Sequence, residues 1–370
     1  MRIKDVRTYY LCVPVKKPWR ISGLAMSEMT ALIVEVEADN GLVGYGEGLT
    51  RLGPSVTQKV VEEVLKPVLL GTDPLEVDVL WERMFATMMS RGHWKGFMVE
   101  AMSGVDIALW DLLGKALNEP IHKLLGGCHH AKFETYASSI MIMGKEEMLK
   151  EAAELIRRGF NKIKLKIGQG VERDLDYIKA ARQALDPQIG IMIDANSGYT
   201  FESALRLGKM LDPLNILWFE EPVPPYDYNA YARLNDALPM PVVAGESEFT
   251  RWGFRDLIVR GKVPVIQPDV ARCGGLTEAR KIAALASAHG VTVAPHTGAS
   301  GAVSIVASMH YAASLSNFYV FEYMYPENPL REDILKADVF KCENGYMKIP
   351  DEPGLGIELD EENIAKYRKG

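Results

Sequence analysis

The feature that most constrains the fold of this chain is a regular alternation of short β-branched runs with helical stretches. Eight such runs occur at 134–139, 162–167, 190–194, 217–220, 241–244, 265–267, 291–295 and 318–322. Strands that alternate with helices form parallel sheets, and eight such units over about 200 residues are typical of a (β/α) barrel. An open doubly wound sheet is the alternative, but such a sheet would be expected to have a glycine-rich phosphate-binding turn after its first strand, and the sequence has none there.

The residues before this alternation have the pattern of a separate α+β unit. The alternating stretch 31–38 leads through Asp39-Asn40-Gly41 into residues 42–45, which predicts an antiparallel hairpin. Helical periodicity follows at 55–70, 74–89 and 98–117. We therefore expect an α+β capping domain over 1–125, completed by the C-terminal segment 330–370, and a barrel catalytic domain over 126–329.

Composition and charge limit the classes of function. The net charge of −7 over 370 residues disfavours non-specific nucleic-acid binding, which needs a basic surface. The apolar runs are far shorter than a membrane helix requires, and the N-terminus lacks the apolar core of a signal peptide. The cysteines Cys12, Cys128, Cys273 and Cys342 form no CxxC pair, so we expect reduced thiols in a cytoplasmic protein.

Ionisable residues end seven successive strands of the expected barrel, from the second strand onward. They recur about once per βα unit. In chain order they are Lys164 with Lys166, Asp194, Glu220, Glu246, Asp269, His296 and Glu322. Because the C-terminal ends of barrel strands form one ring, where barrel enzymes place their chemistry, we expect these side chains to surround a single site.

Asp194, Glu220 and Glu246 end three adjacent strands of this ring. Three carboxylates this close would raise one another's pKa values unless a cation lay between them. Oxygen ligands without a nearby cysteine favour Mg²⁺, with Mn²⁺ as the alternative. Each carboxylate could instead cap the helix that follows its strand, but equal spacing on adjacent strands favours a metal site.

Candidate proton-transfer groups flank the three acids. Lys162, Lys164 and Lys166 share one face of their strand, and their burial would be costly without the neighbouring carboxylates. A lysine whose pKa is lowered by a nearby cation can act as a general base, whereas an edge strand with a solvated lysine face is the alternative. Asp269 beside His296 would orient the imidazole, so His296 is a second candidate acid or base.

Taken together, these motifs resemble the mandelate racemase subgroup of the enolase superfamily. The resemblance covers nearly the whole chain and implies an α/β fold, a modified TIM barrel of the (β/α)₇β type with an α+β capping domain. The motifs that carry it are Lys164-Leu165-Lys166, Ile193-Asp194-Ala195-Asn196, Trp218-Phe219-Glu220-Glu221-Pro222, Gly245-Glu246, Gln267-Pro268-Asp269, Ala294-Pro295-His296 and, in the cap, Gly44-Tyr45-Gly46-Glu47.

The resemblance also implies a role for each residue of the ring. Lys166 matches the family's base and Lys164 its carboxylate-polarising lysine. The pair Asp269–His296 matches its dyad, and Glu322 matches an acid near the substrate carboxylate. The family's metal ligands carry over to Asp194, Glu220 and Glu246. Glu221 would then lie next to the metal site without binding the ion itself.

Two related branches of the superfamily differ from this sequence at single positions. The muconate-lactonising branch has a lysine at the sixth strand, where this chain has Asp269, and the glucarate dehydratase branch has asparagine as third ligand, where this chain has Glu246. The stretch 103–111 and Gly274-Gly275 look particularly like acid-sugar dehydratases and galactarolactone cycloisomerase.

The expected reaction is removal of the proton α to the carboxylate of a 2-hydroxy acid, through a metal-stabilised enediolate. We favour dehydration of an acid sugar, an aldonate or aldarate, to a 2-keto-3-deoxy acid. A racemase or epimerase and a sugar-lactone cycloisomerase remain alternatives on the same site. A metal-dependent hydrolase would usually need an HxH pair at the first strand, and residues 134–139 contain none. A catalytically silent barrel would be expected to have lost part of the ring, and every member of the ring is present in the sequence.

Substrate specificity is expected to come mainly from loops of the cap that lie over the barrel mouth. Candidate substrate-binding residues are Arg20 and Ser22 in the loop 19–23, Arg51 in the loop 49–51, and Asn196 in the barrel. Arg20 or Arg51 could bind the distal carboxylate of an aldarate. The expected partner is therefore a small-molecule carboxylate, and the resemblance implies a homo-oligomer, either a dimer or an octamer.

Overall fold

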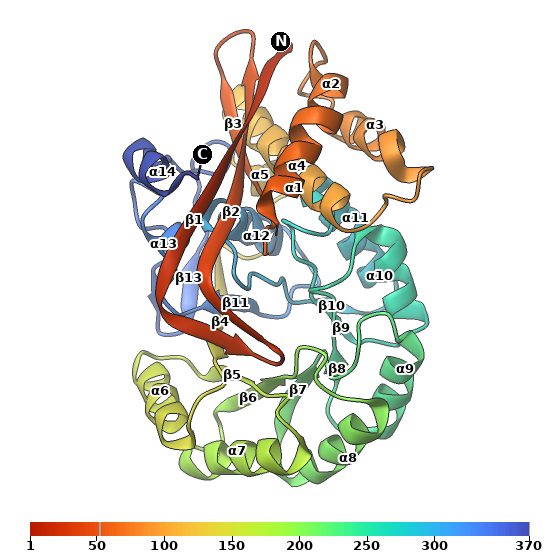
Figure 1. Ribbon diagram of the computed structural model, residues 1–370, viewed down its shortest axis with the longest axis vertical. Helices are drawn as coiled ribbons and strands as arrows, with labels where there is room; N and C mark the ends of the chain where they lie inside the picture. Colours follow the sequence, from red (N-terminus) through yellow and green to blue (C-terminus); the bar gives the residue numbers. More distant parts are fainter. Residues whose placement is uncertain (52, 370) are drawn as a thin grey trace.

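The computed structural model describes residues 1–51 and 53–369. An N-terminal cap of three strands and several helices lies against a ring of strands and helices that contains most of the remaining chain (Figure 1). The cap elements are β1 Ile3–Ile21, β2 Leu24–Ala38, β3 Val43–Gly48, α1 Pro54–Lys59, the π-helical segment η1 Val60–Leu65, α2 Lys66–Leu69, α3 Val77–Met89, α4 Phe97–Leu117 and α5 Ile121–Leu124.

The cap sheet has the order β1-β2-β3 and is antiparallel throughout. Helix α4 packs closely on β3, because β3 carries glycines where the two elements meet: a Cβ at Gly46 would lie 2.0 Å from the carbonyl oxygen of Gly104. Helix α4 ends at Asn118, whose left-handed conformation (φ 55°) lets its N–H bond back to the last turn.

The expected loop at 19–23 is instead the tip of a long β-hairpin. Strand β1 continues to Ile21, and Trp19 pairs with Met26 while Ile21 pairs with Leu24. The turn itself contains only Ser22 and Gly23. Trp19 is buried, so this tip is held by packing as well as by strand pairing, which local propensity does not reveal.

The barrel contains the expected eight strands, each close to its expected position. Its elements are β4 Lys132–Ile140, α6 Lys145–Arg157, β5 Lys162–Lys166, α7 Val171–Ala184, β6 Gly190–Asp194, α8 Phe201–Leu211, the 3₁₀ turn η2 Asp212–Leu214, β7 Ile216–Glu220, α9 Tyr228–Ala237, β8 Val242–Val243, α10 Thr250–Val259, β9 Val265–Ile266, α11 Gly275–Ala288, β10 Thr292–Val293, α12 Ala302–Ala313 and β11 Phe321–Met324.

These strands close into a parallel ring. Strands β4 to β8 pair in chain order, and a bridge between Ala244 and Ile266 joins the β8 segment to β9. Strand β9 pairs with β10, a bridge between Val293 and Phe318 continues the ring, and β11 pairs with β4. The closed parallel ring with a cap confirms the expected fold class, and the expected boundary between residues 125 and 126 falls between α5 and β4.

The C-terminal segment contacts both units. Strand β13 pairs antiparallel with the start of β4, while Arg368 bridges to Leu11 of β1 and Gly354 bridges to Pro120. The segment was expected to complete the cap, and it also extends the sheet at β4. Its elements are α13 Pro329–Glu332, β12 Cys342–Glu343, β13 Tyr346–Lys348 and α14 Glu361–Tyr367.

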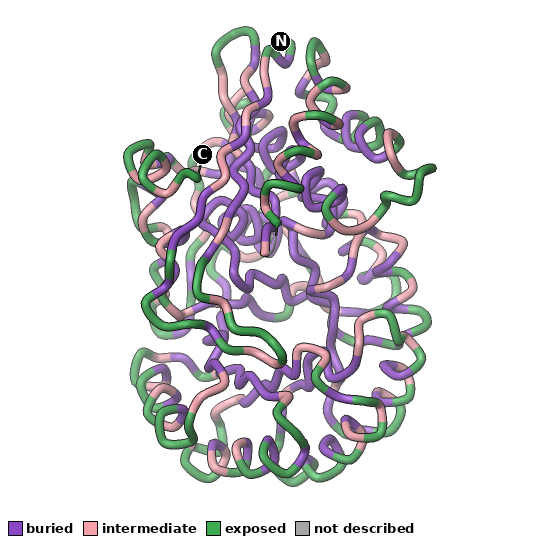
Figure 2. The backbone as a smooth tube through the Cα atoms, in the orientation of Figure 1, coloured by how far each residue is buried: buried purple, intermediate pink, exposed green. Residues whose placement is uncertain are grey.

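Buried residues are concentrated inside the ring and where the ring meets the cap, whereas exposed residues lie mainly on the outer faces of the helices (Figure 2). The four cysteines are free thiols. Within the described ranges, no helix has both the length and the apolar character needed to cross a membrane.

Candidate active site

Three buried carboxylates meet at the C-terminal end of the barrel strands. Asp194 and Glu220 end β6 and β7 and are register partners, and Glu246 lies just beyond β8. One oxygen from each carboxylate lies within 4.8 Å of the others. Glu220 Oε2 and Glu246 Oε2 have no hydrogen-bond partner among the described residues. Buried carboxylate oxygens without donors are costly, and a hard divalent cation would satisfy them, so this donor set fits a metal ion.

The pKa values of these acids differ because their surroundings differ. Burial raises the pKa of Glu220 well above its ordinary range, although the Lys164 ammonium opposes the shift. Burial alone would also raise the pKa of Glu246, but positive charge on His296, Lys166 and Arg51 outweighs it and brings the pKa to about 2.

Glu221 follows Glu220 in the chain but does not join the three convergent carboxylates. Burial, reinforced by the charge of Glu246, raises its pKa to about 8. Its carboxylate accepts a hydrogen bond from Ser247 Oγ at 3.3 Å and is not one of the three groups that converge.

Lys164 is fully buried beneath the cavity and lies between two acids. Its Nζ is 2.6 Å from Glu220 Oε1 and 2.9 Å from Glu322 Oε1. Burial by itself would lower the pKa of Lys164, but these two carboxylates raise it well above its ordinary value. Lys164 is therefore an ammonium ion here, and a lowered pKa would require the positive charge of a bound cation.

Lys166 and Lys162 occupy different environments on the same strand. The Lys166 ammonium lines the cavity and contacts Asp194 Oδ2, and the two residues are register partners across β5 and β6. Lys162, by contrast, lies at the start of β5, pairs with Glu134 and remains partly exposed. The structure therefore brings Lys164 and Lys166 to the site and leaves Lys162 outside it.

Asp269 and His296 form a hydrogen-bonded pair. His296 Nδ1 is 2.8 Å from Asp269 Oδ2, and the backbone N–H of Ala271 donates to Asp269 Oδ1 at 2.9 Å. A carboxylate at Nδ1 favours the tautomer with its proton on that nitrogen. His296 Nε2 then faces the site, where it lies 3.3 Å from Glu246 Oε2 and 3.9 Å from Glu322 Oε2.

Glu322 is held as an anion by several donors. Ser138 Oγ donates to Oε1 at 2.7 Å and the backbone N–H of Thr297 donates to Oε2 at 2.6 Å. Burial would raise the pKa of Glu322, but Lys164 and His296 together with these donors lower it well below its ordinary value. Sequence reasoning missed Ser138 and its neighbour Ser139, although the strand-end rule applied to the first strand would have found both.

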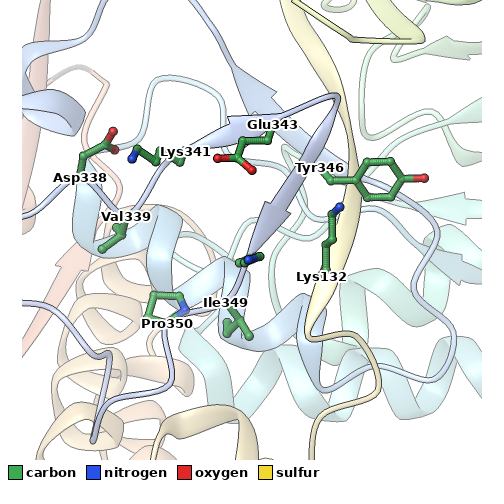
Figure 3. A pocket seen from close by; sticks show the side chains of 9 residues that line it. Lys132, Asp338, Val339, Lys341, Glu343, Tyr346, Ile349 and Pro350 are labelled. Atoms are coloured by element: carbon green, nitrogen blue, oxygen red, sulfur yellow. The ribbon is translucent and has the colours of Figure 1, made fainter.

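A small cavity of about 20 Å³ lies directly over these groups. The barrel contributes Lys166, Glu246, His296 and Glu322 to its lining, and the cap contributes Arg51 and the hairpin tip. A larger cavity of about 290 Å³ is lined by Lys132, the first residue of β4, and by residues around β12 and β13 (Figure 3). It therefore lies at the opposite end of β4 from Ser138 and contains none of the expected site residues.

The expected substrate-binding residues are not all brought to the cavity. Arg51 lines it and donates to the carbonyl of Gly298 at 3.1 Å. The backbone N–H of Asn196 donates to Asp194 Oδ1 at 2.8 Å, and Ser22 Oγ donates to the carbonyl of Gly168 at 3.3 Å. The side chain of Arg20 is exposed and does not line the cavity.

Known proteins with the same architecture resemble this chain over its full length. It is 36% identical to arabinonate dehydratase from Saccharolobus solfataricus, with 99% of each chain covered, and 36% identical to D-galactarolactone cycloisomerase from Agrobacterium fabrum, with 100% of this chain and 99% of the relative covered. The crystal structure of 3,6-anhydro-D-galactonate cycloisomerase from Zobellia galactanivorans has a TM-score of 0.92 and 34% identity, with both chains fully covered.

Family comparisons agree with these individual relatives. Residues 5–126 match the family described as mandelate racemase/muconate lactonizing enzyme, N-terminal domain, and residues 147–363 match the family described as enolase C-terminal domain-like. With the barrel, the cap and the ring of strand-end residues, these matches show that the chain is an enzyme of the enolase superfamily and belongs to its mandelate racemase/muconate lactonizing enzyme group.

Proposed function

We propose that this enzyme dehydrates an acid sugar, an aldonate or aldarate, to a 2-keto-3-deoxy acid. The observation that carries the proposal is the placement of two proton-transfer groups at the two ends of one carboxylate triad. Lys166 contacts Asp194 at one end, and His296 lies beside Glu246 at the other. Both line the same cavity, so a base and an acid can act on neighbouring carbons of one substrate.

Asp194, Glu220 and Glu246 would hold a divalent cation, Mg²⁺ in our proposal with Mn²⁺ as the alternative. When bound, this ion supplies positive charge to the substrate carboxylate as negative charge grows on it. Lys164 keeps a second positive charge beside the same region. Ser138 and Thr297 hold the carboxylate of Glu322 in place, so that Lys164 stays aligned.

Proton transfer begins at C2 of the substrate. Lys166 Nζ, as the free amine, takes the C2 proton, and the bonding electrons move toward the carboxylate. The C3–O bond then breaks as the imidazolium form of His296, which carries a proton on each ring nitrogen, delivers its Nε2 proton to the departing hydroxyl, which leaves as water. The enol that remains loses the proton of its C2 hydroxyl and gains one at C3, and so becomes the 2-keto-3-deoxy acid. The overall change is the loss of one water molecule from the acid sugar.

Cycloisomerisation of a sugar lactone is the second candidate function. D-Galactarolactone cycloisomerase, compared above, is named for a lactone substrate. Removal of the same α-proton would begin both reactions. In this case the lactone oxygen departs from the β-carbon in place of the hydroxyl, so that the ring opens without loss of water. His296 would then face a carboxylate leaving group, which needs less help from an acid.

Substrate entry requires movement of the cap. A cavity of about 20 Å³ holds roughly one water molecule, far less than an acid sugar occupies. Trp19, Ile21 and Met26 of the hairpin tip line the cavity from the side of the cap, so the proposal assigns the movement to this tip. The proposal also includes a homo-oligomer in the cytoplasm, for which family membership is the support.

The proposed function is tested with Mg²⁺ and a library of aldonates, aldarates and their lactones in D₂O. We expect a 2-keto-3-deoxy acid from at least one open-chain acid, detected as its semicarbazone and by NMR. Product from a lactone alone would establish the cycloisomerase. Deuterium at C2 without keto acid would point to a racemase or epimerase, and neither exchange nor product from any compound would refute the proposal.

A further inference from the structure

We propose that Glu47, a residue of the cap, is a positioning residue for His296, which it holds in place through helix α12 and the loop before it. The structural part stands on contacts alone, whereas its kinetic consequence rests on the proposed function. Glu47 lies on β3 and is 1% exposed, more than two hundred residues from His296 in the sequence.

The Glu47 carboxylate binds the N-terminus of α12. The backbone N–H of Gly301 donates to Oε1 at 2.7 Å, and that of Ser304 donates to Oε2 at 3.1 Å. Gly301 is the N-cap residue of α12 and has no side chain to cap its own helix. Glu47 therefore supplies from another domain the cap that this helix lacks, and its charge also complements the helix dipole.

Glu47 has no other function evident from its contacts. Among the described residues, the hydrogen bonds to its carboxylate come from the start of α12, and Glu47 does not line the cavity. Burial raises its pKa to about 7, although the two N–H groups oppose the shift. An acid buried at this cost is explained by the helix it caps, because burial of a carboxylate without partners is strongly unfavourable.

The loop between His296 and Gly301 leaves little freedom for the imidazole. A Cβ at Gly298 would lie only 2.5 Å from His296 Nε2, so the backbone of this loop packs directly against the ring. Arg51 donates to the carbonyl of the same Gly298 at 3.1 Å. If the N-terminus of α12 moved away from Glu47, this backbone would move with it, and the imidazole would lose its support.

The segment that contains Glu47 also supports the partner of His296. The backbone N–H of Leu49 donates to the carbonyl of Ala271 at 3.0 Å, and the N–H of Ala271 in turn donates to Asp269. Residues 47–51 thus hold both members of the Asp269–His296 pair from the cap.

The loop after Lys166 has different supports: Ser22 of the cap hairpin donates to the carbonyl of Gly168 at 3.3 Å, and α7 holds the same loop from within the barrel. Asp174 of α7 accepts hydrogen bonds from the backbone N–H groups of Gly168 at 2.8 Å and Gln169 at 2.7 Å. The two proton-transfer groups therefore have separate supports. Loosening Glu47 should weaken the step assigned to His296 and leave the step assigned to Lys166 largely unchanged.

The test compares Glu47→Gln with Asp111→Asn in the full-length enzyme loaded with Mg²⁺. Asp111 is the control, because it is also a buried acid of the cap and accepts from two backbone N–H groups, those of Tyr45 and Leu355, both away from the dyad; unlike Glu47, it also pairs with Lys115 at 2.6 Å. For each variant, C2 deuterium exchange and keto-acid formation are measured on the same acid sugar. We expect Glu47→Gln to lower keto-acid formation about 10- to 100-fold and exchange less than about threefold.

The control Asp111→Asn is expected to change the rate of C2 exchange and the rate of keto-acid formation by the same factor. If Glu47→Gln lowered the rate of C2 exchange and the rate of keto-acid formation by the same factor, the proposal would be overturned. A loss of global stability alone predicts that result. If Glu47→Gln does not fold, Glu47→Asp replaces it, since it keeps the charge but withdraws the carboxylate by one methylene.

A second measurement does not depend on the reaction. The proton shared by His296 Nδ1 and Asp269 should give a low-field NMR signal that is missing from His296→Asn. We expect this signal to broaden or vanish in Glu47→Gln and to persist in Asp111→Asn. An unchanged signal in Glu47→Gln would refute the positioning role, whereas a wild-type enzyme without exchange or product would refute only the proposed function.

Discussion

The Lys166 ammonium contacts the Asp194 carboxylate, and the two residues are direct register partners across β5 and β6. The proposed base therefore contacts one of the three proposed metal ligands directly. A cation that binds Asp194 would compete with Lys166 for this carboxylate and would place positive charge near the lysine Nζ.

We expect Lys166→Ala to abolish most of the exchange at C2. Loss of a positioned general base typically costs about 100- to 10,000-fold in rate. Deuterium incorporation measured by NMR checks this, and circular dichroism verifies that the variant folds. Lys162→Ala on the same strand is the control, because Lys162 pairs with Glu134 outside the site, and it should stay within about twofold of wild type. Comparable losses in both variants would contradict the assignment of Lys166.

Glu220 and Glu221 are adjacent acids, and metal binding should distinguish them. We expect Glu220→Gln to weaken Mg²⁺ binding at least about tenfold, because Glu220 belongs to the convergent triad. Glu221→Gln should weaken it less. Calorimetric titration measures both, and the rise of Tm with Mg²⁺ should shrink in parallel, since a ligand that binds only the folded state stabilises it. A larger effect of Glu221→Gln would move the ligand assignment to that residue.

Arg51 should discriminate between two classes of acid sugar. It is the one arginine that lines the cavity within the described ranges, and its Nε has no hydrogen-bond partner there. If its role is to bind a distal carboxylate, Arg51→Gln should lower kcat/KM for aldarates about tenfold or more beyond its effect on aldonates. Steady-state kinetics on a matched aldonate and aldarate checks this. Equal losses on both substrates would mean that Arg51 acts on the loop alone.

His310 should make the fold sensitive to acid. Burial lowers its pKa from 6.5 to about 4, so the folded protein keeps the ring neutral while the unfolded chain binds a proton. The stability that this group contributes is present above pH 6.5 and is lost as pH falls toward 4, by up to about 3 kcal/mol.

The variant His310→Gln should remove this dependence. Glutamine can still donate to the carbonyl of Leu355, which His310 Nε2 contacts at 3.0 Å. As the pH falls from 6.5 to 4, the wild type should therefore lose unfolding free energy that the variant keeps. Urea denaturation of both proteins across this pH range measures the difference. A constant difference across this range would show that His310 is not the responsible group.

The amino-acid sequence by itself determined the period of the barrel and the identity of the residues at its strand ends. Both are local properties: β-branched runs specify strands, and the residue that ends each strand must lie at the C-terminal end of the ring once the ring closes. For this reason Asp194, Glu220 and Glu246, and with them Lys166 and His296, could be assigned before any coordinates. The same rule would have reached Ser138 had it been applied to the first strand.

Only the tertiary structure decided how the cap meets this ring. The hairpin tip depends on pairing between Trp19 and Met26, and the cap of α12 depends on Glu47, which the sequence places in a different domain. Thr297 contributes its backbone N–H, which no side-chain pattern reports. Local periodicity relates none of these residues. The contact of Glu47 with Gly301 forms because the cap and the barrel bury their surfaces against one another, whereas the contacts of Trp19 and Thr297 form within the cap and within the barrel.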